Sequence, residues 1–149
     1  MTTTSTVAPA REFMVATFHV GDLWLAIPVE RVQEIRRGVD VTPIPNSPEF
    51  VRGVINLRGE VATVIDMRRL LQLPPAAPSA ADRCLIVRDE GEAIGLWVDR
   101  VGDMATVPQS RIRPLPANIA DAEDRCFKGV LQQDDNVLIL LDLTEVLTC

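Results

Sequence analysis

Residues 52–71 read Arg-Gly-Val-Ile-Asn-Leu-Arg-Gly-Glu-Val-Ala-Thr-Val-Ile-Asp-Met-Arg-Arg-Leu-Leu. Much of this stretch recurs 76 residues later, where residues 128–147 read Lys-Gly-Val-Leu-Gln-Gln-Asp-Asp-Asn-Val-Leu-Ile-Leu-Leu-Asp-Leu-Thr-Glu-Val-Leu. The apolar frame repeats, and so does the Asp that follows it. The middle does not repeat, since Asn56-Leu57-Arg58-Gly59 corresponds to Gln132-Gln133-Asp134-Asp135. A frame shared by two copies indicates a folding requirement, and the turn that differs is a candidate position for function.

The repeat extends towards the N-terminus. Residues 25–35 correspond to residues 94–104 at an offset of 69, so that Val-Glu-Arg-Val at 29–32 becomes Val-Asp-Arg-Val at 98–101. Similar segments in the same order indicate a duplicated supersecondary unit. We place copy one at about residues 13–71 and copy two at about residues 84–147.

The length of 149 residues suits one compact domain. Each copy alone would have a marginal core, so we expect the two copies to share one. Residues 1–11 are Thr-rich without periodicity and are predicted to be a disordered tail. Residues 12–149 then form a single domain, with a Pro- and Ala-rich linker at residues 74–81 between the copies.

Short β-favouring segments separated by turn residues dominate the chain and predict small antiparallel barrels or sandwiches, with about five strands from each copy. The apolar spacing in Val29–Ile35 favours a short helix, and the matching segment Val98–Met104 predicts another helical turn. Asp66 and Asp142 occupy corresponding positions in the two copies. Each is predicted to cap a short helix, because an apolar segment follows it.

Signals of catalysis or metal binding are missing. The lone histidine, His19, has no patterned partner, and Cys84, Cys126 and Cys149 are too widely spaced for an obvious zinc site. No phosphate-binding loop, dinucleotide fingerprint or nucleophile elbow is present. The net charge of −6 disfavours a general nucleic-acid surface, and no apolar run is long enough to span a bilayer. We therefore expect a protein without enzymatic activity, cofactor, metal, nucleic-acid partner or membrane insertion.

Arg58 is the most distinctive polar residue because it lies at the tip of a predicted hairpin. A charged residue there can simply keep the turn soluble. It can also present a guanidinium rigidly to a partner, a role in which Arg is common at interfaces. Glu34 carries the same two interpretations, and Val32 and Ile35 are either core or contact residues.

Several segments together resemble the CheW family of bacterial chemotaxis coupling proteins. They are V-E-R-V-Q-E-I at 29–35, T-P-I-P-N at 42–46, F-V-R-G-V-I-N-L-R-G-E-V at 50–61 with V-I-D-M-R at 64–68, and I-G-L-W-V-D-R-V-G-D-M at 94–104. The resemblance covers about Phe13 to Leu147. One departure is Ala62-Thr63, where the family often has an apolar residue and Pro.

The resemblance implies an all-β fold with short helices, in which two SH3-like five-stranded barrels pack on a shared apolar core. It implies a cytoplasmic adaptor, recruited to receptor arrays, that joins the tip of methyl-accepting chemoreceptors to the regulatory domain of a CheA-type histidine kinase. Carried over by position, the receptor-facing residues are Arg58, Asn56, Glu34 and Val32, and we add Ile35 as part of the groove beside the Arg58 turn.

Three alternatives remain at this point. The adaptor could serve a non-flagellar pathway such as twitching motility or surface sensing, which the chain alone does not distinguish. The second alternative is a β-barrel nucleic-acid-binding module, which would bind oligonucleotides with a steep dependence on salt. The net negative charge and the small number of aromatic residues disfavour it. An enzyme with an unrecognised site is the third alternative.

Overall fold

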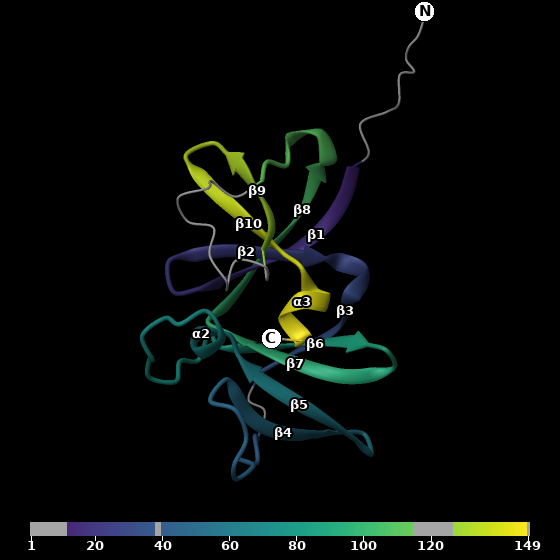
Figure 1. Cartoon of the computed structure of the whole chain (residues 1–149), viewed down its shortest axis with the longest axis vertical. Helices are drawn as coiled ribbons and strands as arrows, with labels where there is room; N and C mark the ends of the chain where they lie inside the picture. The colour runs from purple at the N-terminus through teal and green to yellow at the C-terminus, as the bar shows by residue number, and fades with distance from the viewer. Residues whose placement is uncertain (1–11, 38–39, 115–126, 149) are drawn as a thin grey trace, which may run out of the picture.

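The computed structural model describes residues 12–37, 40–114 and 127–148, which form two five-stranded sheets and a few short helices (Figure 1). In chain order the elements are β1 (Glu12–Val20), β2 (Leu23–Pro28), η1 (Val29–Arg31), β3 (Val32–Arg36), β4 (Val51–Leu57), β5 (Glu60–Asp66), α2 (Met67–Leu70), β6 (Arg83–Asp89), β7 (Glu92–Val98), β8 (Arg100–Pro108), η2 (Gln109–Arg111), β9 (Phe127–Gln133), β10 (Asn136–Leu141) and α3 (Leu143–Thr148). The predicted tail at residues 1–11, Cys126 and Cys149 lie outside the described residues.

The strand order of the two sheets confirms the duplication. The first sheet has the order β8-β1-β2-β10-β9, and the second has the order β3-β6-β7-β5-β4. If β1 to β5 of copy one are matched in sequence with β6 to β10 of copy two, the two orders are identical. The predicted fold class, mostly β with two five-stranded units, is therefore confirmed.

The assignment of one unit to each sequence copy is wrong. Each sheet takes strands from both copies, because the chain passes from the first sheet to the second before β3 and returns to the first before β8. The first sheet thus combines β1 and β2 with three strands of copy two. A repeat of the apolar frame identifies sister strands, but it carries no information on which strands pair.

The strand exchange also changes the expected pairing direction. Each sheet contains one parallel pair, β2 with β10 in the first and β5 with β7 in the second, among otherwise antiparallel neighbours. Parallel neighbours need a long connection between them. Here the partners come from different copies, which supplies that connection.

The segments predicted as helical turns are mostly strands. Only residues 29–31 form a single 3₁₀ turn, and β3 and β8 follow. The helix-like spacing of Val32 and Ile35 has another cause, since the pairing of β3 with β6 shifts register between Val32 and Glu34. Val32 lies opposite Val87 and Ile35 opposite Leu85, so this bulge brings both side chains to the same face.

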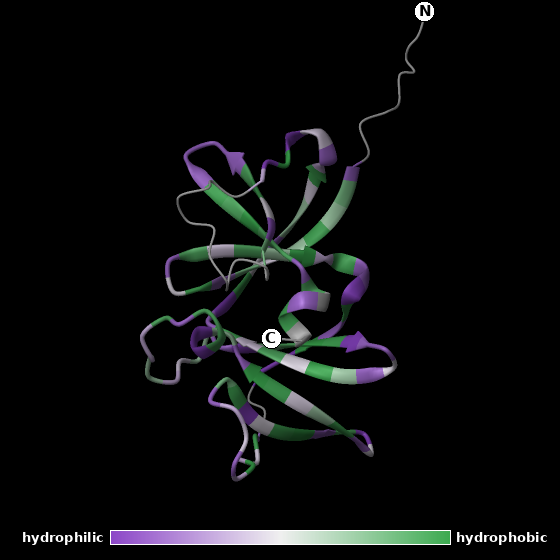
Figure 2. Ribbon diagram, in the orientation of Figure 1, coloured by the Kyte–Doolittle hydropathy of each residue, from purple (hydrophilic) through white to green (hydrophobic). Residues whose placement is uncertain are grey.

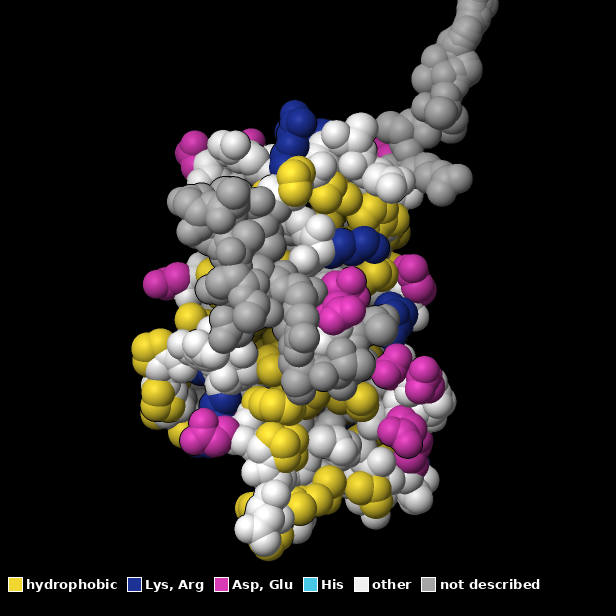
Figure 3. All heavy atoms as spheres, viewed as in Figure 1, with side chains coloured by type: hydrophobic (Ala, Val, Ile, Leu, Met, Phe, Trp, Pro, Cys, Tyr) yellow, Lys and Arg dark blue, Asp and Glu magenta, His cyan; other side chains and the backbone are white. Residues whose placement is uncertain are grey.

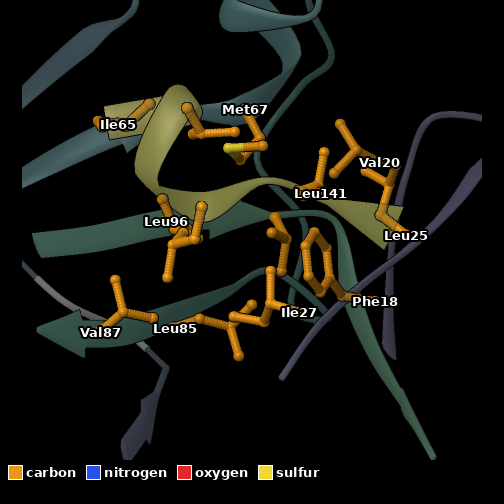
Figure 4. Packing of buried hydrophobic residues seen from close by; sticks show 13 residues of the cluster. Phe18, Val20, Leu25, Ile27, Ile65, Met67, Leu85, Val87, Leu96 and Leu141 are labelled. Carbon is orange, nitrogen blue, oxygen red and sulfur yellow. The ribbon is translucent and has the colours of Figure 1, made fainter. Parts of the chain in front are cut away.

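Three groups of buried side chains form the core. The largest joins the two sheets, as predicted for a shared core, and Figure 4 shows Phe18, Leu25 and Ile27 of the first sheet packed towards Leu85 and Leu96 of the second. Each sheet also encloses a smaller group at repeat-related positions. These are Ile55, Ala62 and Val64 in the second sheet and Leu131, Leu138 and Leu140 in the first.

The distribution of hydropathy agrees with this packing, because strand centres are hydrophobic and most connecting turns hydrophilic (Figure 2). The predicted helix caps are present. The Asp66 carboxylate accepts hydrogen bonds from the N–H groups of Arg68 and Arg69, and Asp142 accepts one from Glu145 N–H at 3.3 Å. Both caps hold a short helix directly after a core strand.

One ion pair ties copy one to copy two at the edge of the shared core. Arg68 of α2 donates to Asp99 in a bidentate arrangement, with Nε–Oδ1 and Nη2–Oδ2 distances of 3.0 and 2.7 Å. Asp99 also accepts the Gly21 N–H at 2.8 Å. Partial burial opposes ionisation of Asp99, but the hydrogen bonds from Arg68 and Gly21 prevail and lower the pKa of this carboxyl.

The Asp99→Asn substitution is expected to destabilise the protein by roughly 1 kcal/mol at pH 7, because a partly exposed charged hydrogen bond is worth little more. A carboxyl with a lowered folded-state pKa stabilises above its unfolded pKa and loses that effect as pH falls through its folded value. The difference between variant and wild type should therefore shrink below about pH 4. Urea unfolding at pH 7 and pH 3 measures it, and an equal difference at both pH values would contradict the assignment.

Candidate partner-binding surface

Arg58 occupies a rigid two-residue turn between β4 and β5. Arg58 has a φ of 53° and Gly59 a φ of 87°, and two successive left-handed residues are typical of tight hairpin turns. The side chain of Asn56 accepts the Gly59 N–H at 3.0 Å and so holds the turn from inside. Asn56 is thus positioned to support the turn, although its side chain is also exposed.

The structure brings Glu34 and Arg58 together from distant parts of the sequence. Arg58 Nη2 lies 3.3 Å from Glu34 Oε2, and Glu34 also accepts a hydrogen bond from Arg36 Nε. That hydrogen bond, aided by the charges of Arg58 and Arg36 and opposed by desolvation, lowers the pKa of Glu34. The Arg58 side chain remains 75% exposed, so its guanidinium is available to a second partner.

The other two predicted residues lie on the opposite face of β3. Val32 packs against the shared core, and Ile35 lies on the same face but is 47% exposed. Glu34 and Arg36 lie opposite Ile86 and Cys84, which belong to the core of the second sheet. The predicted set is therefore divided into a charged group at the hairpin tip and an apolar pair on the reverse side of β3.

Sequence reasoning missed the ion pair that braces the Arg58 turn. The Arg88 guanidinium contacts both carboxylate oxygens of Glu60 at 2.8 and 2.7 Å, and it also donates to the Gly91 carbonyl at 2.8 Å. This contact joins the β4–β5 turn to the β6–β7 turn. The hydrogen bond and charge of Arg88 lower the pKa of Glu60 despite its desolvation.

Val61 was also missed, although it is 66% exposed and lies directly opposite Asn56. The sequence carries a signal for this exposure, because side chains alternate between the two faces of a strand. Val61 precedes the buried Ala62, so its apolar side chain lies on the solvent face. We call the group Glu34, Arg36, Asn56, Arg58 and Val61 the tip surface. It combines an open guanidinium at the turn with an exposed apolar side chain on the strand that follows, which suits a carboxylate at the edge of a nonpolar contact.

A cavity of about 480 Å³ lies on the second sheet, away from the turn, and its lining includes Arg52, Asp66, Arg69 and Trp97. The Arg52 guanidinium stacks over the Trp97 ring at 4.1 Å and contacts Asp66 at 3.2 Å. These contacts explain the Trp97 side chain, which the sequence places where copy one has a proline.

The described residues show no arrangement suited to metal binding. No group of three or more His, Cys, Asp or Glu side chains is gathered in them. Burial raises the pKa of Cys84 to about 12, so its nucleophilic thiolate is scarce at neutral pH. None of the helices in this part of the chain has the length and apolar character of a membrane span.

The two sheets share a core, and the second carries a charged hairpin turn held in place by ion pairs. This arrangement defines a small all-β protein suited to binding a partner. The model of the CheW-like domain family matches residues 14–148, nearly the whole chain. The chain belongs to this family and is a chemotaxis coupling adaptor.

Similar proteins are found in several bacteria. The probable chemotaxis protein CheW of Rhizobium etli is 35% identical over 126 residues, covering 85% of this chain and 81% of that protein. Protein FrzA of Myxococcus xanthus is 33% identical over 141 residues, covering 93% and 86%. The crystal structure of the scaffolding protein TtCheW from Thermoanaerobacter tengcongensis superimposes with a TM-score of 0.81 at 27% identity, covering 89% of this chain and 90% of that one.

Proposed function

We propose that this chain couples the cytoplasmic tip of methyl-accepting chemoreceptors to the regulatory domain of a CheA-type kinase, without catalysis of its own. It acts in the cytoplasm and is recruited to receptor arrays through its partners. The receptor-binding part of this proposal rests on the exposed Arg58 guanidinium. Its turn is held by the Asn56 side chain and by the Glu60–Arg88 ion pair. A braced turn loses little backbone freedom on binding, so more of the interaction energy of its arginine becomes affinity.

The tip surface supplies the chemistry of receptor recognition. Arg58 contacts Glu34 at 3.3 Å but is mostly open, so a receptor carboxylate can share or replace this partner. Val61 and Ile35 are exposed apolar side chains on opposite sides of this region. A helix of the receptor tip would contact the charged turn and one of these apolar side chains in a helix-in-groove arrangement.

The kinase contact is proposed to use the remaining sheet edges, with one small β unit against another. Coupling requires that receptor and kinase bind at once, so their surfaces must not overlap. Weak individual contacts gain strength in an array because each bound adaptor raises the effective concentration of the next partner.

A ternary reconstitution tests the coupling function. Receptor-containing membranes, a CheA-type kinase and this protein are combined, and kinase autophosphorylation is measured with and without the adaptor. We expect the adaptor to recruit kinase to the membranes and to change its activity in a receptor-dependent manner. Unchanged recruitment and activity at saturating adaptor would rule the proposal out for that pathway, and pairs from non-flagellar pathways would then be tested.

A second candidate is the same adaptor role in a non-flagellar chemosensory pathway. The similarity to FrzA, at 33% identity over 93% of this chain, supports this second candidate. The nucleic-acid alternative has less support, because the chain carries a net charge of −6 and the face in Figure 3 shows scattered acidic side chains and no continuous basic area among the described residues.

A further inference from the structure

A large groove lies on the first sheet, on the half of the molecule that does not carry Arg58. Its volume is about 920 Å³, within the range of ligand-binding clefts. Side chains from three regions line it, namely the β1–β2 hairpin, β8 and the ends of β9 and β10. They include His19, Trp24, Arg100, Met104, Gln133 and Asn136.

Two stacked rings form part of the groove wall. The His19 and Trp24 rings lie 6.3 Å apart between centroids and 16° from parallel. Nδ1 of His19 is buried and has no hydrogen-bond partner among the described residues. Buried polar atoms normally have such a partner, so this nitrogen leaves the groove wall without one of the contacts that usually fix a buried histidine.

The duplication shows what fills the equivalent place in the second sheet. By the offsets of the repeat, His19 corresponds to Arg88 and Asn136 corresponds to Glu60. In the second sheet these two positions are bridged by the bidentate Arg88–Glu60 pair at 2.7–2.8 Å. In the first sheet they carry a ring and an amide that both line the groove. The second sheet thus accommodates an arginine side chain where the first sheet has open space.

The charges around the groove favour a cation. Asp22 and Asp103 line it, and Asp134 and Asp135 form the turn between its lining residues Gln133 and Asn136. Each of these four residues is exposed, and none has an ion pair within the described part of the chain.

Arg100 is the opposing charge in the lining, but it does not exclude a second guanidinium. Its counterpart Arg31, in η1, donates to the backbone carbonyl of Arg88 at 3.3 Å and lies 3.8 Å from the Asp89 carboxylate, so an arginine at this position can turn to other partners. Burial, together with the charge of Arg100, lowers the pKa of His19, so this ring is neutral at neutral pH. A neutral histidine adds no repulsion and leaves the stacked rings available for cation–π contact.

We propose that the groove on the first sheet is a second binding site, which takes an arginine side chain from an exposed segment of a partner protein. The guanidinium lies at the His19–Trp24 stack and is attracted by Asp22 and Asp103. The Met104 side chain, 63% exposed, covers the aliphatic stem of the arginine. This site is independent of Arg58, so it holds whether or not the tip surface binds the receptor.

The test uses a short acetylated, amidated peptide, Gly-Arg-Gly, and the matched peptide with citrulline in place of arginine. Citrulline has nearly the same shape but no charge. The Trp97→Phe variant leaves Trp24 as the only tryptophan, so fluorescence reports on the groove. We expect a saturable change with the arginine peptide in the millimolar range and at least fivefold weaker binding of the citrulline peptide.

Variants complete the test. The Asp22→Asn, Asp103→Asn double variant should bind the arginine peptide at least fivefold more weakly, whereas Glu90→Gln, Glu92→Gln at the β6–β7 hairpin should bind it as wild type does. Circular dichroism verifies that both are folded. Equal binding of the two peptides, or an unchanged affinity in the groove variant, would overturn the proposal. So would concentration-dependent self-association lost in the groove variant, because the occupant would then be a second copy of this chain.

Discussion

The Arg58→Asn variant is expected to bind receptor membranes about 30-fold more weakly, a loss of about 2 kcal/mol that is typical of an interface hot spot. Asn tolerates the left-handed backbone that the turn requires, so the hairpin keeps its shape while the guanidinium is lost. Arg58→Glu should weaken binding at least as much, because it places a second carboxylate beside Glu34. Co-sedimentation of purified protein with receptor membranes measures both variants.

The matched control is Arg111→Asn, which removes an exposed arginine from η2 in the other copy. Its affinity should stay within about twofold of wild type, since an isolated surface charge contributes little. The thermal midpoint of each variant should be close to that of the wild-type protein. Wild-type-like sedimentation of Arg58→Asn, with the fold intact, would remove Arg58 from the receptor contact.

The Phe18→Ala variant is expected to lose about 3–5 kcal/mol of stability, because it opens a cavity in the core that joins the two sheets. Phe18 is fully buried, and Figure 4 shows it between strands of both sheets. A loss of this size is a large fraction of the stability of a domain of this length. The two sheets should unfold together, since each contains strands from both copies.

Tryptophan fluorescence measures this cooperativity directly, because Trp24 lies in the first sheet and Trp97 in the second. Trp24→Phe and Trp97→Phe versions of the protein should give the same urea midpoint, both before and after the Phe18 substitution. The control Val137→Ala, at a side chain that is 50% exposed, should change stability by less than about 0.5 kcal/mol. Separate midpoints for the two reporters would show that the sheets are independent.

The sequence predicted the sister elements of the fold well, because they depend on patterns within single strands. The matching apolar residues around Gly53 and Gly129 identified the duplicated hairpins, and both glycines are buried against the backbone of a neighbouring segment. Asp66 and Asp142 were correctly predicted as caps, since capping is a local interaction. Pairing between strands depends on where the chain crosses from one sheet to the other, which happens before β3 and before β8. No local sequence pattern records these crossings.

The same distinction applies to the candidate surface. Arg58 could be identified because it lies in a turn that differs between the copies. Its contact with Glu34 depends on the closeness of β3 to the β4–β5 turn, and the Glu60–Arg88 brace depends on the neighbouring turns of two hairpins. The spacing of Val32 and Ile35 suggested a helix because a bulge in a strand produced the same periodicity.

The exchange of strands between the sheets also has a consequence for the history of the molecule. A chain of half this length, with the strands of one copy only, could complete neither sheet by itself, but two such chains could complete both by swapping arms. The present protein has the architecture of such a swapped dimer, fused by the segment at residues 72–82, which contains no helix or strand. Fusion allows the two halves to change in sequence independently. Arg58 and Asp134, which occupy the same position in corresponding turns, are one result of that divergence.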